Sequence, residues 1–335
     1  MAMKKTLWPE NFVRIPQEDW AQGEVELLAL KYDTVENHGW YSNLARTVSQ
    51  IGDYMQDGHI FLDYSGGTGI LAGRLLEAFP EKRFGVLIVD SSPKFLRLAL
   101  EKFRHEDRVA LRLIRYRKEQ RRLDLVDEVL DPDFLARGAD GLACTNAIHL
   151  YYDLPDTLAA WQRVLKSGAR VFIQSGNIRN PEAGEDEWII DETVEHIHLA
   201  AMEIVREEER FVRYRPCLED REYMRQHDAL RQKYFLPVKP LSHYVSALQV
   251  AELPVLEITR QTIEAEVDEW FNFLAVYHEG VVGWLGGARK LVGREPANDV
   301  VRDRFSLMRL AMERVFAGKP TFKTCWTYLV CERTA

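Results

Sequence analysis

The sequence predicts an α/β fold built on a doubly wound, mostly parallel sheet that has helices on both faces. Between residues 59 and 174, five short apolar segments alternate with segments of helical periodicity, a pattern typical of a parallel sheet. A glycine-rich turn at 65–69 joins the first apolar segment to the first of these helices. A charged helical stretch at 181–235 then interrupts the alternation, so we expect helical additions to the sheet.

Each expected element has a local reason. Strands are expected at the short apolar runs, and helices where apolar residues recur three or four positions apart. The run Ser91-Ser92-Pro93 marks a helix start, because serine caps a helix and proline suits its first position. The expected strands are 59–63, 83–89, 108–114, 141–145, 170–174, 255–263 and 321–331. The expected helices are 17–32, a second ending near 55, 70–79, 93–103, 121–130, 155–166 with Gly168 at its end, one within 236–252, a broken stretch at 267–290, and 299–317.

Composition and charge narrow the class of protein. The chain has 335 residues, and its hydrophobic content of 46% is ample for a globular core. Its net charge of −8, from 52 acidic and 44 basic residues, argues against a nucleic-acid partner and an anionic membrane surface. The sequence has no run of 18 apolar residues and no signal-peptide pattern, so we expect a cytoplasmic protein. The four cysteines lack metal-ligand spacing and are expected to be reduced.

The glycine-rich turn is the strongest candidate for a ligand site. The strand before it ends at Asp63, and the turn reads Ser65-Gly66-Gly67-Thr68-Gly69. Glycines let a ligand approach the backbone and aim amide N–H groups at it. Residues 67–72 also fit the dinucleotide pattern G-x-G-x-x-A, with Asp90 at the distance expected for a ribose contact. The acid before the glycines instead favours S-adenosylmethionine (SAM), because the SAM amino group is a cation and a pyrophosphate is not.

Three stretches carry a family resemblance. Residues 63–69 resemble motif I of class I SAM-dependent methyltransferases, with Ser65 where a first glycine is usual. Residues 140–176 resemble the fourth-strand region of that family, and 163–169 its Arg-x-Leu-Lys-x-Gly-Gly turn, with Ala169 replacing the second glycine. The resemblance covers roughly residues 59–175. It implies a seven-stranded Rossmann-like methyltransferase sheet whose last strand is antiparallel.

The resemblance also suggests a division of the chain. Residues 1–58 are expected to form an N-terminal helical extension or cap, and 59–180 the SAM-binding Rossmann-like core. Residues 181–235 are expected to be a helical insertion that acts as a lid. Residues 236–335 would complete the core with the last strands and a helical insertion on the acceptor side. The sequence departs from the family at Ile114-Arg115-Tyr116, where many members place an acid near the adenine amino group.

The expected cofactor contacts follow from the ends of the strands. Asp90 would hold both ribose hydroxyls, because a carboxylate accepts two hydrogen bonds side by side. Asn146 can donate and accept near the methionine part of SAM. Either residue could instead satisfy only the local backbone. The predicted cofactor-binding residues are Tyr41, Asp63, Ser65, Gly66, Gly67, Gly69, Asp90, Ser91 and Asn146.

The catalytic candidates are His149 and Tyr152. His149 lies at the carboxyl edge of the predicted sheet, where a base could take a proton from an acceptor, although a lone histidine is more often structural. Aromatic side chains can attract the sulfonium cation, and Tyr32, Trp40, Tyr41, Tyr151 and Tyr152 are the candidates. Acceptor contacts are expected among Trp188, Asp191, His196, His198, Trp270, Tyr277, His278, Glu279 and Trp284. A metal is not expected, because residues one or two apart do not share a helix face.

The resemblance implies a SAM-dependent methyltransferase that acts on a small-molecule acceptor by in-line displacement and leaves S-adenosylhomocysteine. An alternative is SAM chemistry without methyl transfer, either cyclisation such as azetidine-2-carboxylate formation or aminocarboxypropyl transfer, which releases methylthioadenosine. An NAD(P)-dependent oxidoreductase and a non-catalytic SAM-binding subunit are further alternatives. The expected partner is a small molecule, with no nucleic acid and no membrane.

Overall fold

A central sheet of eight strands organises the protein in a computed structural model, which describes residues 7–334. Seven strands follow the order β11-β12-β7-β6-β1-β2-β3, and β9 (Glu187–Trp188) pairs with the outer part of β12. β12 is antiparallel to both of its long neighbours, while the strands from β7 to β3 are parallel. The strands are β1 (Ile60–Tyr64), β2 (Gly85–Asp90), β3 (Val109–Leu113), β6 (Ala139–Thr145), β7 (Leu165–Ser175), β11 (Val255–Glu266) and β12 (Thr321–Glu332).

This arrangement confirms the predicted fold class, including the antiparallel last strand. Every residue of β1, β2 and β3 is buried, which is why each reads as a continuous apolar run rather than an alternating one. Two hydrophobic clusters pack the faces of the sheet. The helices on one face are α3 (Leu44–Tyr54), α4 (Ile70–Ala78) and α5 (Pro93–Phe103). The helices on the other face are α6 (Pro132–Arg137), α7 (Leu154–Val164) and α11 (Leu241–Val250).

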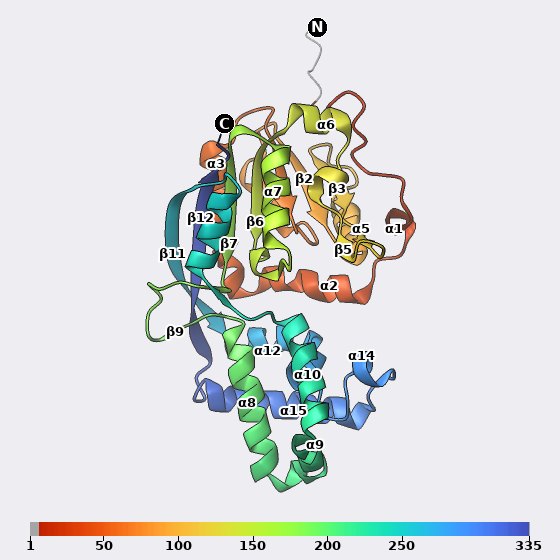
Figure 1. The fold of residues 1–335 in the computed structure, drawn as a ribbon, viewed down its shortest axis with the longest axis vertical. Helices are drawn as coiled ribbons and strands as arrows, with labels where there is room; N and C mark the ends of the chain where they lie inside the picture. The colour runs from red at the N-terminus through yellow and green to blue at the C-terminus, as the bar shows by residue number, and fades with distance from the viewer. Residues whose placement is uncertain (1–6, 335) are drawn as a thin grey trace.

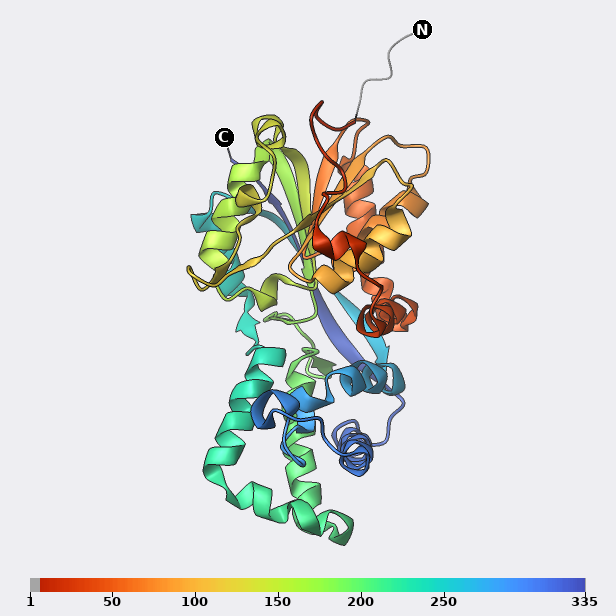
Figure 2. The ribbon, with the colours of Figure 1, turned by 90° about the vertical axis from the view of Figure 1, so that its right-hand side faces the viewer.

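A helical lobe lies beyond one edge of this layered core, in the lower half of Figure 1. A third hydrophobic cluster joins its helices, which come from two separate parts of the sequence. The 12-residue strands β11 and β12 run from the sheet down to the lobe, as Figure 2 shows for β12. The lobe consists of α8 (Glu192–Glu207), η5 (Glu209–Tyr214), α9 (Arg215–Glu219), α10 (Arg221–Tyr234), α12 (Val267–Val276), α13 (His278–Val282), α14 (Arg289–Val292) and α15 (Asn298–Val315).

The N-terminal segment differs from its prediction. In place of the single helix expected at 17–32, the chain forms two short helices, α1 (Asp19–Gln22) and α2 (Leu27–Asp33). The backbone adopts an extended conformation at Gly23, which ends the first of them. Two 3₁₀ turns follow, η1 (Thr34–Asn37) and η2 (Gly39–Asn43). We call residues 27–43 the cover segment, because α2 runs along the sheet edge that faces the lobe (Figure 1).

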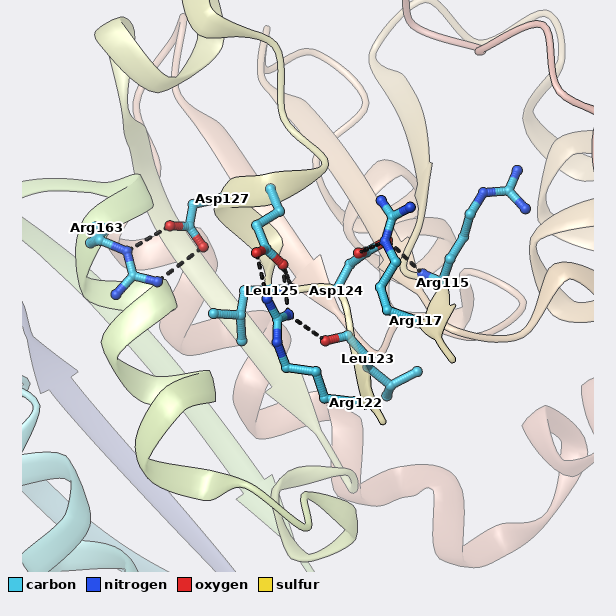
Figure 3. A network of polar contacts seen from close by, with 9 residues as sticks. Arg115, Arg117, Arg122, Leu123, Asp124, Leu125, Asp127 and Arg163 are labelled. Carbon is cyan, nitrogen blue, oxygen red and sulfur yellow. Dashed lines mark hydrogen bonds and ion pairs between the residues drawn. The ribbon is translucent and has the colours of Figure 1, made fainter. Parts of the chain in front are cut away.

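The prediction of a helix at 121–130 is wrong. The chain instead forms a hairpin of β4 (Tyr116–Arg117) and β5 (Arg122–Leu123), followed by the 3₁₀ turn η3 (Val126–Glu128). Figure 3 shows the reason, which is a set of ion pairs and hydrogen bonds that no helix could satisfy. The Arg115 N–H and the Arg117 guanidinium both donate to Asp124, and Arg122 donates to both Glu128 oxygens at 2.7 and 2.6 Å.

The remaining predicted boundaries lie close to those observed. The helix α5 spans Pro93–Phe103 as predicted, and its cap is the Ser92 hydroxyl, which accepts from the Phe95 N–H. The helix expected at 155–166 ends at Val164, and Gly168 lies inside β7 with a φ of +75° rather than at a helix end. The helix α6 (Pro132–Arg137) was not predicted.

Candidate functional site

The glycine-rich turn connects β1 to α4 at the carboxyl edge of the sheet. Gly67 and Gly69 adopt left-handed φ values of +57° and +80°, which glycine reaches without strain. A Cβ on Gly66 would lie 2.6 Å from the Asp63 carboxyl carbon, and one on Gly69 would lie 2.6 Å from the Phe103 ring. The turn therefore requires glycine at these positions for its shape, before any ligand is considered.

Two buried carboxylates lie beside this turn. Asp90 accepts hydrogen bonds from the Gly67 N–H at 2.8 Å and the Ser92 N–H at 2.7 Å. Asp63 is 1% exposed, and neither of its carboxylate oxygens makes a hydrogen bond of good geometry within residues 7–334, although the Ala72 backbone N–H lies close enough to favour the ionised form. Burial raises the pKa of Asp63 to about 7, and the charge of Asp90 adds to this shift. Burial also raises the pKa of Asp90, although its backbone donors oppose the shift.

A nearly closed cavity lies over the turn, with room for about 30 Å³ of solvent. Three segments that are distant in the sequence line it. The cover segment and the first residue of α3 contribute Tyr32, Trp40, Tyr41, Asn43 and Leu44. The turn and α4 contribute Ser65, Gly66, Thr68, Ile70 and Leu71. The ends of β6 and β7 contribute Thr145, Asn146 and Gln174.

Polar atoms without partners gather at this cavity. Buried polar atoms in proteins nearly always make hydrogen bonds, so an exception needs an explanation. Here the explanation would be a bound ligand, because several exceptions line one cavity. Within the part of the chain that the structure describes, the unpartnered atoms on its lining are Trp40 Nε1, Asn43 Oδ1, Thr68 Oγ1 and Gln174 Oε1.

Two lining residues have positive φ angles. Ser65 has a φ of +59° and Asn146 a φ of +51°, a left-handed region that costs serine about 1–2 kcal/mol but that asparagine tolerates. The hydroxyl groups of Ser65 and Tyr151 lie 2.9 Å apart, within hydrogen-bonding distance. This contact gives Ser65 a role that the glycine usual at that position could not fill.

Tyr152 does not reach the cavity. Its side chain is 79% exposed, whereas the neighbouring Tyr151 is partly buried and contacts Ser65 and Cys144. The structure therefore does not support Tyr152 as a catalytic residue. The reason is the 3₁₀ turn η4 (Ile148–Leu150), after which the chain directs Tyr151 inward and Tyr152 outward.

His149 lies behind the cavity rather than on its lining. Its Nδ1 is 3.2 Å from the Ser175 hydroxyl, and its Nε2 is 3.1 Å from the Asn177 amide nitrogen and 3.9 Å from Asp191. Burial lowers the pKa of His149 to about 3, so the imidazole is neutral near pH 7. The Ser175 hydroxyl also donates to Asn146 Oδ1 at 3.4 Å, which links His149 to the cavity through two side chains.

Most of the expected acceptor contacts lie elsewhere. Trp270 and Trp284 are 2% and 1% exposed in the core of the lobe, and His198 contacts the Val281 carbonyl. Ser91 is exposed beside Asp90 and does not line the cavity. Of the other predicted cofactor residues, Tyr41, Ser65, Gly66 and Asn146 line it, whereas Asp63, Gly67, Gly69 and Asp90 do not. Residues 7–334 contain no group of three or more His, Cys, Asp or Glu side chains placed to hold a metal ion. None of the helices in this range is long and apolar enough to cross a membrane.

Several residues on the cavity lining were not predicted from the sequence. Gln174 ends a predicted apolar strand, and Thr68 lies inside the glycine turn, so a polar residue at either place was a usable signal. Asn43 carried no such signal, because only the folded cover segment brings it to the sheet edge. Its backbone carbonyl accepts from the Tyr328 hydroxyl at 2.9 Å, which helps to hold it there.

Known proteins resemble this chain in fold but not in sequence. No family model matches the chain, and no curated protein matches it. The YcgJ protein from Bacillus subtilis has 13% identity and a TM-score of 0.50, over 88% of this chain and 99% of that one. Geranyl diphosphate methyltransferase in complex with SAM has 12% identity and a TM-score of 0.45, over 93% of this chain and 92% of that one.

Another similar structure is phosphoethanolamine N-methyltransferase 2 from Haemonchus contortus, in complex with phosphomonomethylethanolamine and S-adenosylhomocysteine. It has 16% identity and a TM-score of 0.49, over 95% of this chain and 60% of that one. At such identities the likeness concerns the fold. The chain therefore has a Rossmann-like α/β fold, a mostly parallel sheet with the antiparallel last strand that the resemblance to class I methyltransferases implies.

Proposed function

We propose that this protein is a SAM-dependent methyltransferase for a small-molecule acceptor. The observation that carries the proposal is the set of unpartnered polar atoms at the cavity beside the glycine turn. Most of them are oxygen atoms that accept hydrogen bonds, on Asn43, Thr68, Gln174 and the adjacent Asp63. Such a site suits a ligand with an ammonium group. A pyrophosphate needs hydrogen-bond donors, so a dinucleotide fits the same lining less well.

The residues present match the parts of SAM. The carboxylate of Asp90 has lone pairs left for a ribose diol beside the two backbone N–H groups that it already accepts from. The Asp63, Asn43 and Gln174 oxygens would accept from the ammonium group. The rings of Trp40 and Tyr41, centred 4.7 Å apart, give the cavity an aromatic wall for a sulfonium cation.

When bound, SAM supplies an electrophilic methyl group, so the protein has mainly to position the acceptor and exclude water. The closed cover segment performs the second task. His149 is neutral at pH 7 and lies 3.2 Å from the Ser175 hydroxyl, which donates to Asn146, so it would position the Asn146 side chain at the cavity rather than take a proton itself. His149→Ala is then expected to lower turnover by about 100-fold with little change in SAM affinity. Early melting with normal turnover per folded molecule would make His149 structural.

Ligand binding tests the cofactor. Thermal melting should shift upward with SAM or S-adenosylhomocysteine, because a ligand that binds only the native state stabilises it. NAD(P) should cause no shift, and Asp90→Ala should abolish most of the shift seen with SAM. A shift with NADH and none with SAM would overturn the cofactor assignment.

A second candidate is SAM chemistry without methyl transfer. It rests on the rings of Tyr32, Trp40 and Tyr41 on the cavity lining, which are walls of the kind that would fold the SAM chain back on itself. Chromatography of the products separates the two reactions. S-adenosylhomocysteine that forms only with an acceptor supports methyl transfer. Methylthioadenosine that forms from SAM and enzyme alone, faster than without enzyme, supports cyclisation instead.

A further inference from the structure

A groove on the surface of the helical lobe lies between η5, α12 and α15, and it has about 390 Å³ of solvent space. Its lining is apolar at Phe271, Phe305 and Leu310, and the two phenylalanine rings have centroids 6.4 Å apart. Arg210 and Arg309 also line it, so the groove combines an apolar surface with two guanidinium groups.

The groove is basic, although the chain has a net charge of −8. Arg309 pairs with Asp268, and its guanidinium lies 3.7 Å from the centre of the Phe271 ring. Arg210 lies over the Phe211 ring at 4.5 Å, and no carboxylate in the described part of the chain pairs with it. An occupant with apolar side chains and an unpaired carboxylate would therefore complement the groove.

A second surface of the same chain has this complementary character. It comprises residues 24–31, which are the outer face of α2 and the residues just before that helix. Leu27, Leu28 and Leu30 are 64%, 39% and 46% exposed. Glu24 is exposed, and no cation within residues 7–334 pairs with it. Exposed leucines that cluster in this way mark an interaction surface.

The inner face of α2 holds the helix on its own core, so the leucines are not needed for that purpose. Ala29 is fully buried, and the Tyr32 ring stacks on Phe95 with centroids 4.6 Å apart. Residues three or four apart share a helix face, so Leu27 and Leu30 lie together on the side away from Ala29.

The charges at the two ends of residues 24–31 also match the groove. Glu24 precedes the leucines, and Lys31, which is exposed and has no acidic partner among the described residues, follows them. The groove offers Arg210 to the first charge and Asp268, 79% exposed beside Arg309, to the second. Opposite charges placed in this way fix the direction in which a helix enters a groove.

The chain cannot fill its own groove with this helix. Figure 2 shows α2 (red) above α12 and α15 (both blue) along one side of the molecule, so α12 stands between α2 and the groove. A second copy related by a twofold axis presents the same elements in the opposite order. The outer face of α2 in each copy then meets the groove of the other, and the contact forms twice.

We propose that the protein forms a twofold-symmetric homodimer in which α2 of each protomer packs into the α12–α15 groove of its partner. The leucines of one protomer would contact Phe271 and Phe305 of the other, and Glu24 would pair with Arg210. Because Tyr32 of α2 lines the cofactor cavity, the partner would contact the outer side of a helix whose inner side covers that cavity. This dimer would form whether or not the protein is a methyltransferase.

Sedimentation velocity of the full-length protein tests the dimer, and the wild type should sediment as a dimer at micromolar concentration. Leu27→Glu adds a charge to the leucine face, and Arg210→Glu reverses a charge in the groove. Each contact occurs twice, so either variant should raise the dimer dissociation constant about 100-fold. Val250→Glu, at an 84% exposed position on the core, is the matched control and should remain dimeric. Circular dichroism should give the same helical content for all three variants.

A mixture of the two interface variants tests whether these two surfaces meet. The Arg210→Glu copy keeps its helix and the Leu27→Glu copy keeps its groove, so one of the two contacts can still form. With a fluorophore on one variant, sedimentation should show mixed dimers that are more stable than the dimers of either variant alone. Mixed dimers no more stable than those would overturn the pairing of helix and groove. A monomeric wild type, or Leu27→Glu protein that dimerises as tightly as the wild type, would overturn the proposal.

Discussion

The helical lobe and the carboxyl edge of the sheet both bury polar side chains, but they treat them differently. In the lobe, Arg304 is fully buried and donates to the carbonyls of Gly283, Leu285 and Gly287 at 2.7–3.0 Å. At the sheet edge, Asp63 is almost as deeply buried and its carboxylate makes no hydrogen bond of good geometry within the described residues.

We infer that the unpartnered atoms gathered at the sheet edge belong to the proposed ligand site, whereas those elsewhere, such as Arg231 Nε in the lobe and Trp161 Nε1 in the core, are isolated. A buried polar group left without a hydrogen bond costs about 1–3 kcal/mol. The fold of the lobe avoids this cost at Arg304, and again at Trp270, whose indole N–H donates to the Thr193 hydroxyl at 2.9 Å. The sheet edge bears the cost at several atoms around one cavity. Burial of a polar residue is therefore a weak sign of a site in this protein, and burial without a partner is a stronger one.

Substitution of Arg304 is expected to give the largest effect on stability. Arg304→Met would leave three buried carbonyl groups unpaired, so the free energy of unfolding should fall by about 3–5 kcal/mol. Urea denaturation measures this change. Calorimetry should show unchanged S-adenosylhomocysteine affinity per folded molecule. Arg302→Met, at an exposed position of the same helix, is the control. Normal stability in Arg304→Met would mean that the lobe does not depend on these bonds.

Asp63→Asn should have the opposite pattern. The unpaired carboxylate is removed, so the free energy of unfolding should rise by about 1–3 kcal/mol at pH 8, while SAM should bind about 100-fold more weakly. The folded pKa of about 7 lies above the ordinary 3.8, so the penalty is absent below pH 4 and complete above pH 7. The stability gain should therefore vanish at pH 4. Asp53→Asn, at an exposed position of α3, should show neither effect.

The pH dependence of binding sharpens the same contrast. An ammonium group needs Asp63 ionised, so below pH 7 binding must release a proton from it. The dissociation constant for S-adenosylhomocysteine should rise by up to about tenfold per pH unit between pH 7 and pH 5. Calorimetry across this range should find the slope in the wild type and none in Asp63→Asn. Equal slopes in both proteins would assign the titration to another group.

Substitutions of Ser65 are expected to change the stability least, and two variants together separate the backbone strain from the Tyr151 contact. Ser65→Gly removes the left-handed strain but also the contact with Tyr151, so its stability should stay within about 0.5 kcal/mol of the wild type. Ser65→Ala keeps the strain and loses the contact, so it should be about 1 kcal/mol less stable. Chemical denaturation compares the two. An alanine variant as stable as the glycine variant would show that the backbone strain is negligible.

The parts of the fold that could be predicted are those whose signal is local. The buried strands are apolar runs, and the start of α5 is marked by Ser92 as its N-cap and Pro93 at its first position. The hairpin at 116–123 could not be predicted, because its cause is the pairing of Arg115 and Arg117 with Asp124, across the turn. A helical pattern of leucines and valines at 121–130 was a misleading signal in the absence of those pairs.

The site divides in the same way. Asp63, the glycines and Asp90 could be placed from their order along the chain, because strand ends meet at one edge of a parallel sheet. The sequence does not distinguish a tryptophan that faces a cavity from one that packs in a core. For this reason Trp270 and Trp284 were expected at the acceptor, although both are buried. Asn43 and Gln174 reach the cavity only through contacts between segments far apart in the sequence.

If the protein is the methyltransferase that we propose, the cover segment would limit how often it completes a catalytic cycle. A cavity with about 30 Å³ of free space cannot admit a nucleoside, so residues 27–43 must lift for entry and again for release. Its anchors include Glu269 on the Gly39 N–H and the packing of Trp40 against Trp326, with ring centroids 6.1 Å apart. If these contacts open slowly, turnover follows solvent viscosity more than acceptor reactivity, and the purified protein retains its last nucleoside.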